Sequence, residues 1–134
     1  MERRLVELSK ITTFLMFDGQ AEEAMKFYTS VFEESQINHI IHSEDGKVLH
    51  ATFTLKGQTF MCIDSNVKHD FTFTPSMSLF VTCDTEKEID KLFEKLSEGG
   101  QVLMPLTPSP VSQKFGWVTD KFGVSWQLNL AKSQ

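Results

Sequence analysis

The sequence predicts an α+β protein made of two βαβββ modules within a single domain of 134 residues. When the chain is shifted against itself by 65 residues, two helical segments align without a gap, AEEAMKFYTSVF on EKEIDKLFEKLS. Each has apolar residues at i, i+3, i+4 and i+7, the spacing of one helix face. The flanks align too: Thr13-Phe14-Leu15-Met16 falls on Ser78-Leu79-Phe80-Val81. A repeat of this length is a whole supersecondary unit, which indicates two copies of one module.

Composition narrows the function classes. The hydrophobic fraction of 40% and charged fraction of 23% are typical of a soluble globular protein. A net charge of −5 without a basic cluster argues against nucleic acid as a partner. No apolar run approaches the roughly 20 residues that cross a bilayer, so no membrane is expected. The N-terminal MERRLVELSK lacks the apolar stretch of a secretory signal, which favours a cytoplasmic protein.

The first module is expected over residues 10–64. A strand over 10–17 ends at Asp18-Gly19, and a helix over 20–32 carries acidic residues in its first turn. Strands over 36–42 and 48–55 follow, separated by Asp45-Gly46. Lys56-Gly57 then predicts a tight hairpin into a strand over 58–64.

A connector over 65–76 leads to the second module, expected over residues 77–130. It begins with a strand over 77–83 and a helix over 86–97 that stops at Gly99-Gly100. Further strands are expected over 101–106, 115–119 and 124–130. The stretch PLTPSPVSQK (105–114) has three prolines, which predicts a loop. The two cysteines, Cys62 and Cys83, lie in apolar strands and are interpreted as buried reduced thiols rather than a redox pair.

The hairpin fixes which side chains share a face. Leu55 should face Gln58, Phe53 should face Phe60, and Ala51 should face Cys62. These residues and Leu49 make an apolar face to be buried under a helix. The opposite face is of mixed polarity, with His50, Thr52, Thr54, Thr59, Met61 and Ile63. By periodicity alone, this second face fits solvent and a ligand cup equally well.

Three segments carry a resemblance to a known family: FDGQAEEAMKFYTSVF (17–32), HATFTLKGQTFMCIDS (50–65) and KFGWVTDKFGVSW (114–126). With the module order, they resemble the vicinal oxygen chelate superfamily, which includes glyoxalase I, bleomycin-resistance proteins and extradiol dioxygenases. More narrowly, the chain looks like the PhnB-like branch. The resemblance implies curved mixed sheets whose two modules form a cup, usually around a metal and a small substrate. It favours the cup for the mixed face.

The resemblance also places the superfamily's metal ligands at Thr13, Met61, Ser78 and Gln127. Thr13 and Ser78 are partners at the 65-residue offset, and Met61 and Gln127 each lie four residues after a glycine. A thioether, two hydroxyls and a carboxamide are poor ligands for a catalytic divalent ion. We therefore expect no metal and no cofactor.

Among the histidines, His50 is the candidate functional residue, because it matches the PhnB-like pattern HA-x-F and falls on the mixed face. It could act as an acid, a base or a hydrogen-bond donor. His39 and His42 are three apart on one strand and should point to opposite faces, and His69 lies in the connector. Asp64 matches the same pattern, and either a cap at the strand exit or a functional role fits it.

In the segment 114–126, glycines at 116 and 123 indicate close backbone approach and a hairpin. Asp120 should bind turn amides, and Trp126 should join the core with Leu128 and Leu130. Trp117 and Lys114 adjoin the loop over 105–113, which could form a lid. Lys114 could then clamp an anion, or simply be solvated.

Two functions compete. The first is metal-free binding of a small molecule in the cup, by Thr13, His50, Thr52, Met61, Ser78, Lys114, Trp117 and Gln127. The second is a glyoxalase- or dioxygenase-like enzyme that uses His50 or a metal at displaced ligands. A label attached to this family, 3-demethylubiquinone 3-methyltransferase, is not expected to describe the activity, because the chain has no G-x-G of a Rossmann-like domain. A homodimer is expected, because pairing would cover exposed sheet edges. The cup itself could form within one chain or across the homodimer.

Overall fold

The structure is a computed structural model that describes residues 10–132, and the chain divides into two compact units after Lys68. The segment at residues 1–9, on which the expectation of a missing secretory signal rests, lies outside the described residues. No helix in residues 10–132 is long and apolar enough to cross a membrane.

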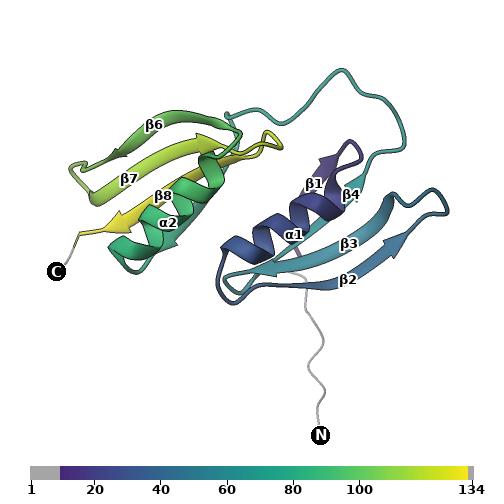
Figure 1. The fold of residues 1–134 in the computed structure, drawn as a ribbon, viewed down its shortest axis with the longest axis horizontal. Helices are drawn as coiled ribbons and strands as arrows, with labels where there is room; N and C mark the ends of the chain where they lie inside the picture. The colour runs from purple at the N-terminus through teal and green to yellow at the C-terminus, as the bar shows by residue number, and fades with distance from the viewer. Residues whose placement is uncertain (1–9, 133–134) are drawn as a thin grey trace, which may run out of the picture. The chain divides into compact units, whose positions relative to one another are not determined.

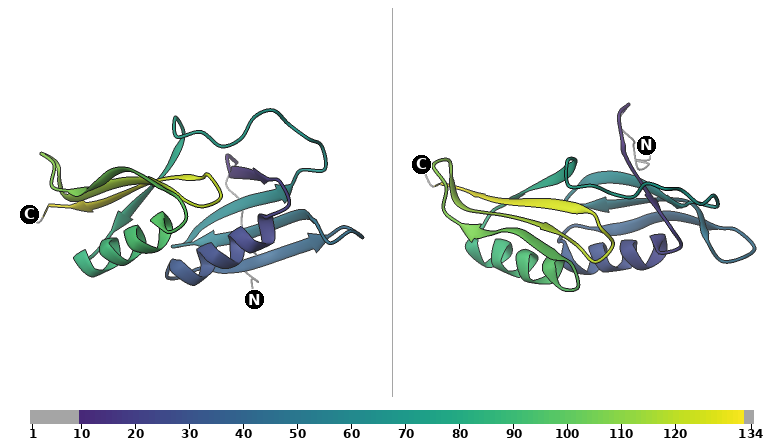
Figure 2. Two further views of the ribbon diagram at one scale, coloured as in Figure 1. Left: turned by 45° about the horizontal axis from the view of Figure 1, so that its top comes forward. Right: turned by 90° about the horizontal axis from the view of Figure 1, so that it is seen from above.

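The first unit has the predicted βαβββ order (Figure 1). Its sheet has the strand order β1-β4-β3-β2, with β1 parallel to β4 and the other pairs antiparallel. Figure 2 shows the helix lying against one face of this sheet. The elements are β1 (Thr13–Phe17), α1 (Ala21–Val31), β2 (Gln36–His42), β3 (Val48–Leu55) and β4 (Gln58–Asp64).

The second unit repeats this topology with the strand order β5-β8-β7-β6, and β5 is parallel to β8. Helix α2 again packs on one face of the sheet, mainly against β7 and β8. The elements are β5 (Ser78–Cys83), α2 (Glu86–Ser97), β6 (Gln101–Thr107), β7 (Ser112–Thr119) and β8 (Ser125–Ala131).

The predicted hairpin at Lys56-Gly57 is confirmed, because Leu55 pairs with Gln58, Phe53 with Phe60, and Ala51 with Cys62. Both turn residues have positive φ, 49° and 84°, as a type I′ turn requires. The apolar side of this hairpin is buried under α1, where Ala24, Met25 and Tyr28 lose all exposure.

Leu49 differs from the expectation that it joins this apolar face. Its side chain is 59% exposed, whereas Val48 is 1% exposed. The pairing of β2 with β3 shifts register here, from Ile41 opposite His50 to His42 opposite Val48. A bulge of this kind breaks strict alternation, so Val48 takes the inward position at the strand end.

The core of the second unit forms where α2 meets the sheet. Ile89, Leu92 and Leu96 of α2 and Trp126 and Leu128 of β8 are all buried where the helix contacts the strand, which confirms Trp126 as a core residue. Gly116 permits this contact: a Cβ atom there would lie 2.8 Å from the Phe93 ring of α2. The glycine is therefore needed for close helix–sheet packing.

The loop expected over residues 105–114 is much shorter in the structure. Strand β6 continues to Thr107 and β7 begins at Ser112, so only residues 108–111 lie outside strands. Strand β6 is an edge strand with register shifts between Val102 and Thr107, where the missing N–H of Pro105 is tolerated.

Candidate functional site

The sheet of the second unit has one helix-covered face and one face without a helix. On β8, Trp126, Leu128 and Leu130 are buried on the helix side, so Ser125, Gln127 and Asn129 point the other way. Their partners are Ser78 and Phe80 of β5, and Phe115 and Trp117 of β7. We call these seven residues the second open face.

A hydrogen-bonded cluster occupies one end of the second open face. The Ser78 and Ser125 hydroxyl oxygens lie 2.6 Å apart, and the Trp117 indole N–H donates to Ser125 Oγ over 2.8 Å. Gln127 Nε2 donates to Ser78 Oγ over 3.4 Å. The fold thus brings together three predicted site residues around Ser125, a residue that sequence reasoning missed.

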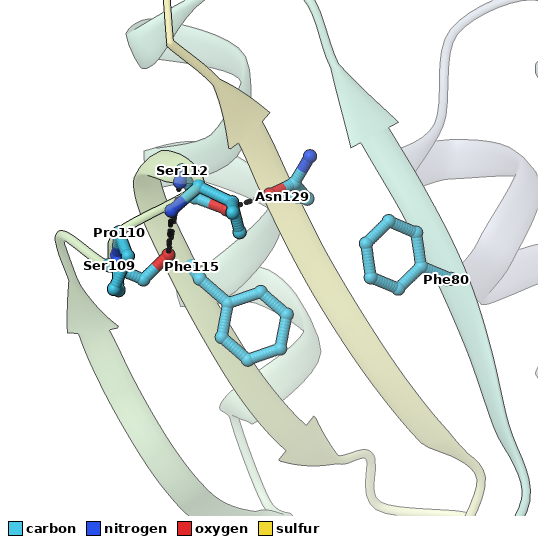
Figure 3. Close-up of a pocket in the computed structure, with 7 residues that line it drawn as sticks. Phe80, Ser109, Pro110, Ser112, Phe115 and Asn129 are labelled. Carbon is cyan, nitrogen blue, oxygen red and sulfur yellow. Dashed lines mark hydrogen bonds between the residues drawn. The ribbon is translucent and has the colours of Figure 1, made fainter.

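A cavity of about 620 Å³ lies at the other end of the second open face (Figure 3). The rings of Phe80 and Phe115 are 6.3 Å apart between centroids and tilted by 32°. Asn129 lies on the strand between them. None of the lining residues is charged; they are Phe80, Ser109, Pro110, Val111, Ser112, Phe115 and Asn129.

The short loop beside the cavity has a defined shape. Ser109 N donates to Ser112 O over 3.0 Å, and Ser112 N donates to Ser109 Oγ over 3.0 Å. The Ser112 hydroxyl donates in turn to Asn129 Oδ1. These bonds tie the loop to β8 and fix one wall of the cavity.

The open face of the first unit holds the other candidates. Thr52 pairs with Met61 on one side and with His39 on the other, and His50 pairs with Ile41. The rings of His39 and His50 are 6.2 Å apart between centroids. His42 Nε2 lies 2.7 Å from Glu22 Oε1 of α1, so His39 and His42 do point to opposite faces. That contact and the one with Lys26 hold the pKa of Glu22 below its usual value.

Thr13 was expected on the open face of the sheet, and this expectation is wrong. Thr13 aligns with buried Phe60 and alternates with buried Leu15 and Phe17, which places it on the helix side. Phe14 lies beside Met61 instead, as Phe80 lies beside Gln127 in the second unit. The strands therefore correspond at an offset of 66 residues, and Thr12 is the counterpart of Ser78.

The strands and the helices repeat at different offsets because the two strand–helix connections differ in length. Residues 18–20 connect β1 to α1, whereas only Asp84 and Thr85 connect β5 to α2. The helices of the two units match at an offset of 65 residues and the strands at an offset of 66. A shift of one residue moves a strand side chain to the opposite face of the sheet.

Lys114 also lies on the helix side, away from Trp117. It precedes Gly116 by two positions, and its Nζ is 2.8 Å from Asp90 Oδ1 and 2.9 Å from Glu86 Oε2, both on α2. The hydrogen bond to Asp90 and, second in size, the one to Glu86 raise the pKa of Lys114. Because Lys114 is paired with acids across the helix–sheet contact, the fold does not bring it to the second open face.

Asp64 and Asp120 both accept hydrogen bonds from groups within their own units. Asp64 accepts from the N–H of Ala21 over 2.8 Å and from that of Val48 over 2.9 Å. Asp120 accepts from Trp126 Nε1 over 2.8 Å and from the turn amides of Phe122 and Val124. Both carboxylates are buried. For Asp64 the structure favours the structural alternative, and for Asp120 the turn prediction is confirmed.

The comparisons with known proteins first define a class. A glyoxylase/bleomycin resistance protein/dioxygenase domain from Frankia sp. EAN1pec has a TM-score of 0.70 at 14% identity, over 95% of each chain. At this identity the likeness shows the fold alone, which is that of a glyoxylase/bleomycin resistance protein/dioxygenase domain. The fold prediction is thereby confirmed.

The particular family follows from the sequence. Residues 9–129 match the family described as 3-demethylubiquinone-9 3-methyltransferase, and the chain belongs to this PhnB-like family. A putative 3-demethylubiquinone-9 3-methyltransferase, PhnB protein, from Bacillus cereus is 62% identical, with a TM-score of 0.89 over 92% of this chain and 100% of that one. Protein YjdN of Escherichia coli K12 is 22% identical over 92% of this chain and 97% of its own length.

The side chains at the superfamily's metal positions do not fit a divalent metal. Ser78 Oγ is already engaged with Ser125, Gln127 offers only an amide and Met61 a thioether. Thr13 lies on the other face, and Thr12, the counterpart of Ser78, offers only a hydroxyl. Within residues 10–132, no group of three or more His, Cys, Asp or Glu side chains could hold a metal ion. Neutral donors of this kind are weak ligands for such an ion.

Sequence reasoning missed Phe80, Phe115, Ser125 and Asn129. A signal was present in β8, where the polar residues of S-x-Q-x-N alternate with the core residues Trp126, Leu128 and Leu130. Reading that alternation would have placed Ser125 and Asn129 beside Gln127. The two phenylalanines gave no such signal, because an apolar strand residue is most often core.

Proposed function

We propose that this protein binds a small uncharged organic molecule on the second open face and does so without a divalent metal. The observation that carries the proposal is the cavity between Phe80, Phe115 and Asn129. Its volume lies within the roughly 300–1,000 Å³ of small-molecule sites, and an apolar wall with a few polar groups is their usual lining. Burying an ion there would cost free energy, because no lining residue could neutralise its charge.

The test combines native mass spectrometry of freshly purified protein with a screen of neutral aromatic fragments by ligand-observed NMR. Phe80→Ala and Phe115→Ala should each weaken binding of a hit by about 5- to 30-fold, because each removes apolar contact area. Phe71→Ala is the matched control, since Phe71 is an exposed phenylalanine that does not line the cavity. Absence of any saturable ligand, or equal loss with Phe71→Ala, would contradict the proposal.

The metal-free part is tested separately. After mild dialysis, elemental analysis should find no stoichiometric divalent metal. Close to one zinc, nickel, manganese or iron per chain would contradict it.

A second candidate function is catalysis that uses His50, and the proximity of His39 favours it. Two imidazole rings bound to one zinc ion at about 2.1 Å and about 109° would have centroids about 5.3 Å apart. The observed 6.2 Å is about 1 Å longer, within reach of small side-chain rotations. The pair could thus hold a metal at displaced ligands, or exchange a proton with a substrate.

Calorimetric titration with Zn²⁺ and Ni²⁺ tests this alternative. His50→Ala and His39→Ala should each abolish binding by a shared site, whereas His42→Ala, whose ring contacts Glu22, should leave it unchanged. If neither metal binds, a metal at these displaced ligands is excluded.

The family description names a methyl transfer, and we do not extend it to this protein. Methyl transfer from S-adenosylmethionine usually requires a Rossmann-like parallel sheet. Each described sheet here has one parallel and two antiparallel strand pairs.

A further inference from the structure

We propose that the cavity of the second unit selects a planar, uncharged ligand with a hydrogen-bond acceptor, such as a carbonyl oxygen or a pyridine-type nitrogen. Phe80 and Phe115 would contact the ligand plane, and the Asn129 amide would donate to its acceptor. This inference rests on the function proposed above and names the ligand class for the same cavity.

The Phe80 and Phe115 rings are the reason why the ligand should be planar. Figure 3 shows the Phe80 and Phe115 rings on either side of β8, and both stand on the open face. Phe80 is 59% exposed, an unusual exposure for a phenylalanine in mid-strand. A flat ligand covers both rings at little entropic cost to the protein, because each ring has only two rotatable side-chain bonds.

The Asn129 amide is the reason why the ligand should carry a hydrogen-bond acceptor. The Ser112 hydroxyl donates to Asn129 Oδ1, so the amide oxygen lies on the Ser112 side. The amide nitrogen then lies on the side away from Ser112, as Figure 3 shows. Within residues 10–132 this nitrogen makes no hydrogen bond, so both of its N–H groups can donate to a ligand.

The cavity lining has no charged side chain, which is the reason why the ligand should be neutral. The seven lining residues carry no ionisable group. The basic residue of β7 next to Phe115 is Lys114, and it binds Asp90 and Glu86 on the other face of the sheet. An ionic ligand would lose hydration without gaining an oppositely charged partner.

The test uses three probes of nearly the same shape: naphthalene, quinoline, which adds a ring-nitrogen acceptor, and N-methylquinolinium, in which that acceptor is blocked and charged. Affinities are measured by NMR titration at about pH 7.5, where quinoline is neutral. Quinoline should bind about 3- to 10-fold more tightly than naphthalene, the increment of one neutral hydrogen bond. N-methylquinolinium should bind more weakly than both.

Asn129→Ala should remove the preference for quinoline and leave the naphthalene affinity nearly unchanged. Asn129→Asp keeps the shape but replaces the donor by an acceptor, so it should weaken quinoline and improve N-methylquinolinium. Asn66→Ala, at an exposed asparagine outside the cavity, is the matched control and should preserve the preference. Melting temperatures of all variants exclude loss of folding as the cause.

The outcomes separate the two proposals. If naphthalene and quinoline bind equally, and Phe80→Ala weakens both, the cavity binds small molecules and the acceptor inference is wrong. A preference that survives Asn129→Ala, or tightest binding of N-methylquinolinium, would also overturn the inference. If none of the probes binds, the inference is wrong, and the fragment screen described above decides the proposed function by itself.

Discussion

Buried carboxylates at two positions hold turns and helix starts in place. Asp64 joins the first amide of α1 to the first amide of β3 through its two oxygens. Because these N–H groups are buried at element ends, only an acceptor at this position satisfies both. The side chain is therefore a structural part of the first unit, although its match to a family pattern also suggested function.

Asp64→Asn tests this role. The amide has one oxygen in place of two, so one buried backbone N–H loses its acceptor and faces an N–H group. Chemical denaturation should show a loss of about 1–3 kcal/mol in the free energy of unfolding. Asp45→Asn is the control, because Asp45 bonds Ser43 and Lys47 in an exposed turn. Equal effects of the two substitutions would contradict the structural role.

Cys62 is buried in β4 beside the same carboxylate. Burial first, and the charge of Asp64 second, raises the pKa of the Cys62 thiol to about 12. In an unfolded chain the pKa of a cysteine thiol is about 8.5. The folded state therefore favours the neutral thiol, whose contribution is complete below the unfolded pKa and declines as pH rises from there towards the folded pKa.

We expect the wild-type protein to lose stability between about pH 8.5 and pH 11 more steeply than Cys62→Ala. Urea denaturation at several pH values measures this difference, and the comparison of slopes removes the constant cost of the smaller side chain. The native thiol should also react slowly with a disulfide reagent at about pH 8 and rapidly in denaturant. Parallel pH profiles of the two proteins would be inconsistent with the raised pKa.

At the scale of elements, sequence patterns predicted most of the fold because each pattern has a local physical cause. The i, i+3, i+4, i+7 spacing identified both helices, and α2 has the expected bounds. The Lys56-Gly57 turn set the register of β3 and β4, and through it the buried set of Ala51, Phe53 and Cys62. Register is well determined where a two-residue turn and a buried face agree.

The candidate site was predicted only in part, for reasons that also act at this scale. Ser78, Trp117 and Gln127 do meet, but Thr13 and Lys114 lie on helix-covered faces. A one-residue difference between two connections is invisible in a repeat aligned on its helices. The meeting of His39 with His50 depends on a bulged pairing of β2 with β3, which no local pattern in the sequence specifies.

The contact of α2 with its sheet gives a prediction for Gly116. In Gly116→Ala the new Cβ would lie 2.8 Å from the Phe93 ring and 2.9 Å from the Leu106 side chain, so both side chains must shift. Thermal or chemical denaturation should show a loss of about 1–3 kcal/mol, the usual cost of overpacking.

The double variant Gly116→Ala/Phe93→Ala checks that the ring is the cause. In a double-mutant cycle, the added methyl group should cost clearly less when Phe93 is absent. Strict additivity of the two substitutions would show that Phe93 does not limit the space at Gly116.

At the scale of the whole molecule, each unit has one open face with candidate ligand contacts. In the first unit these are His50, Thr52 and Met61, and in the second the cluster around Ser125 and the cavity. The resemblance to the superfamily implies that both open faces line one cup, within a chain or across a homodimer. This expectation stays a prediction, and a ligand in the second unit can test it.

If both faces line one cup, a cavity ligand should also act on the first unit. Saturation with quinoline should then shift the NMR signals of the Met61 methyl group and the His50 ring, because an aromatic ring changes the magnetic environment of nearby nuclei. Signals of His42, on the helix side of the first unit, serve as the internal control. Shifts confined to the second unit at saturation would mean that its open face binds ligand alone.

Protein concentration separates the two kinds of cup. A cup within one chain should give the same quinoline affinity at every protein concentration. A cup across a homodimer should lose affinity on dilution below the dimer dissociation constant, because binding is then coupled to association. Light scattering at the same concentrations identifies the species present. A strictly monomeric protein at micromolar concentration, with His50 shifts on saturation, would assign the cup to one chain and contradict the homodimer.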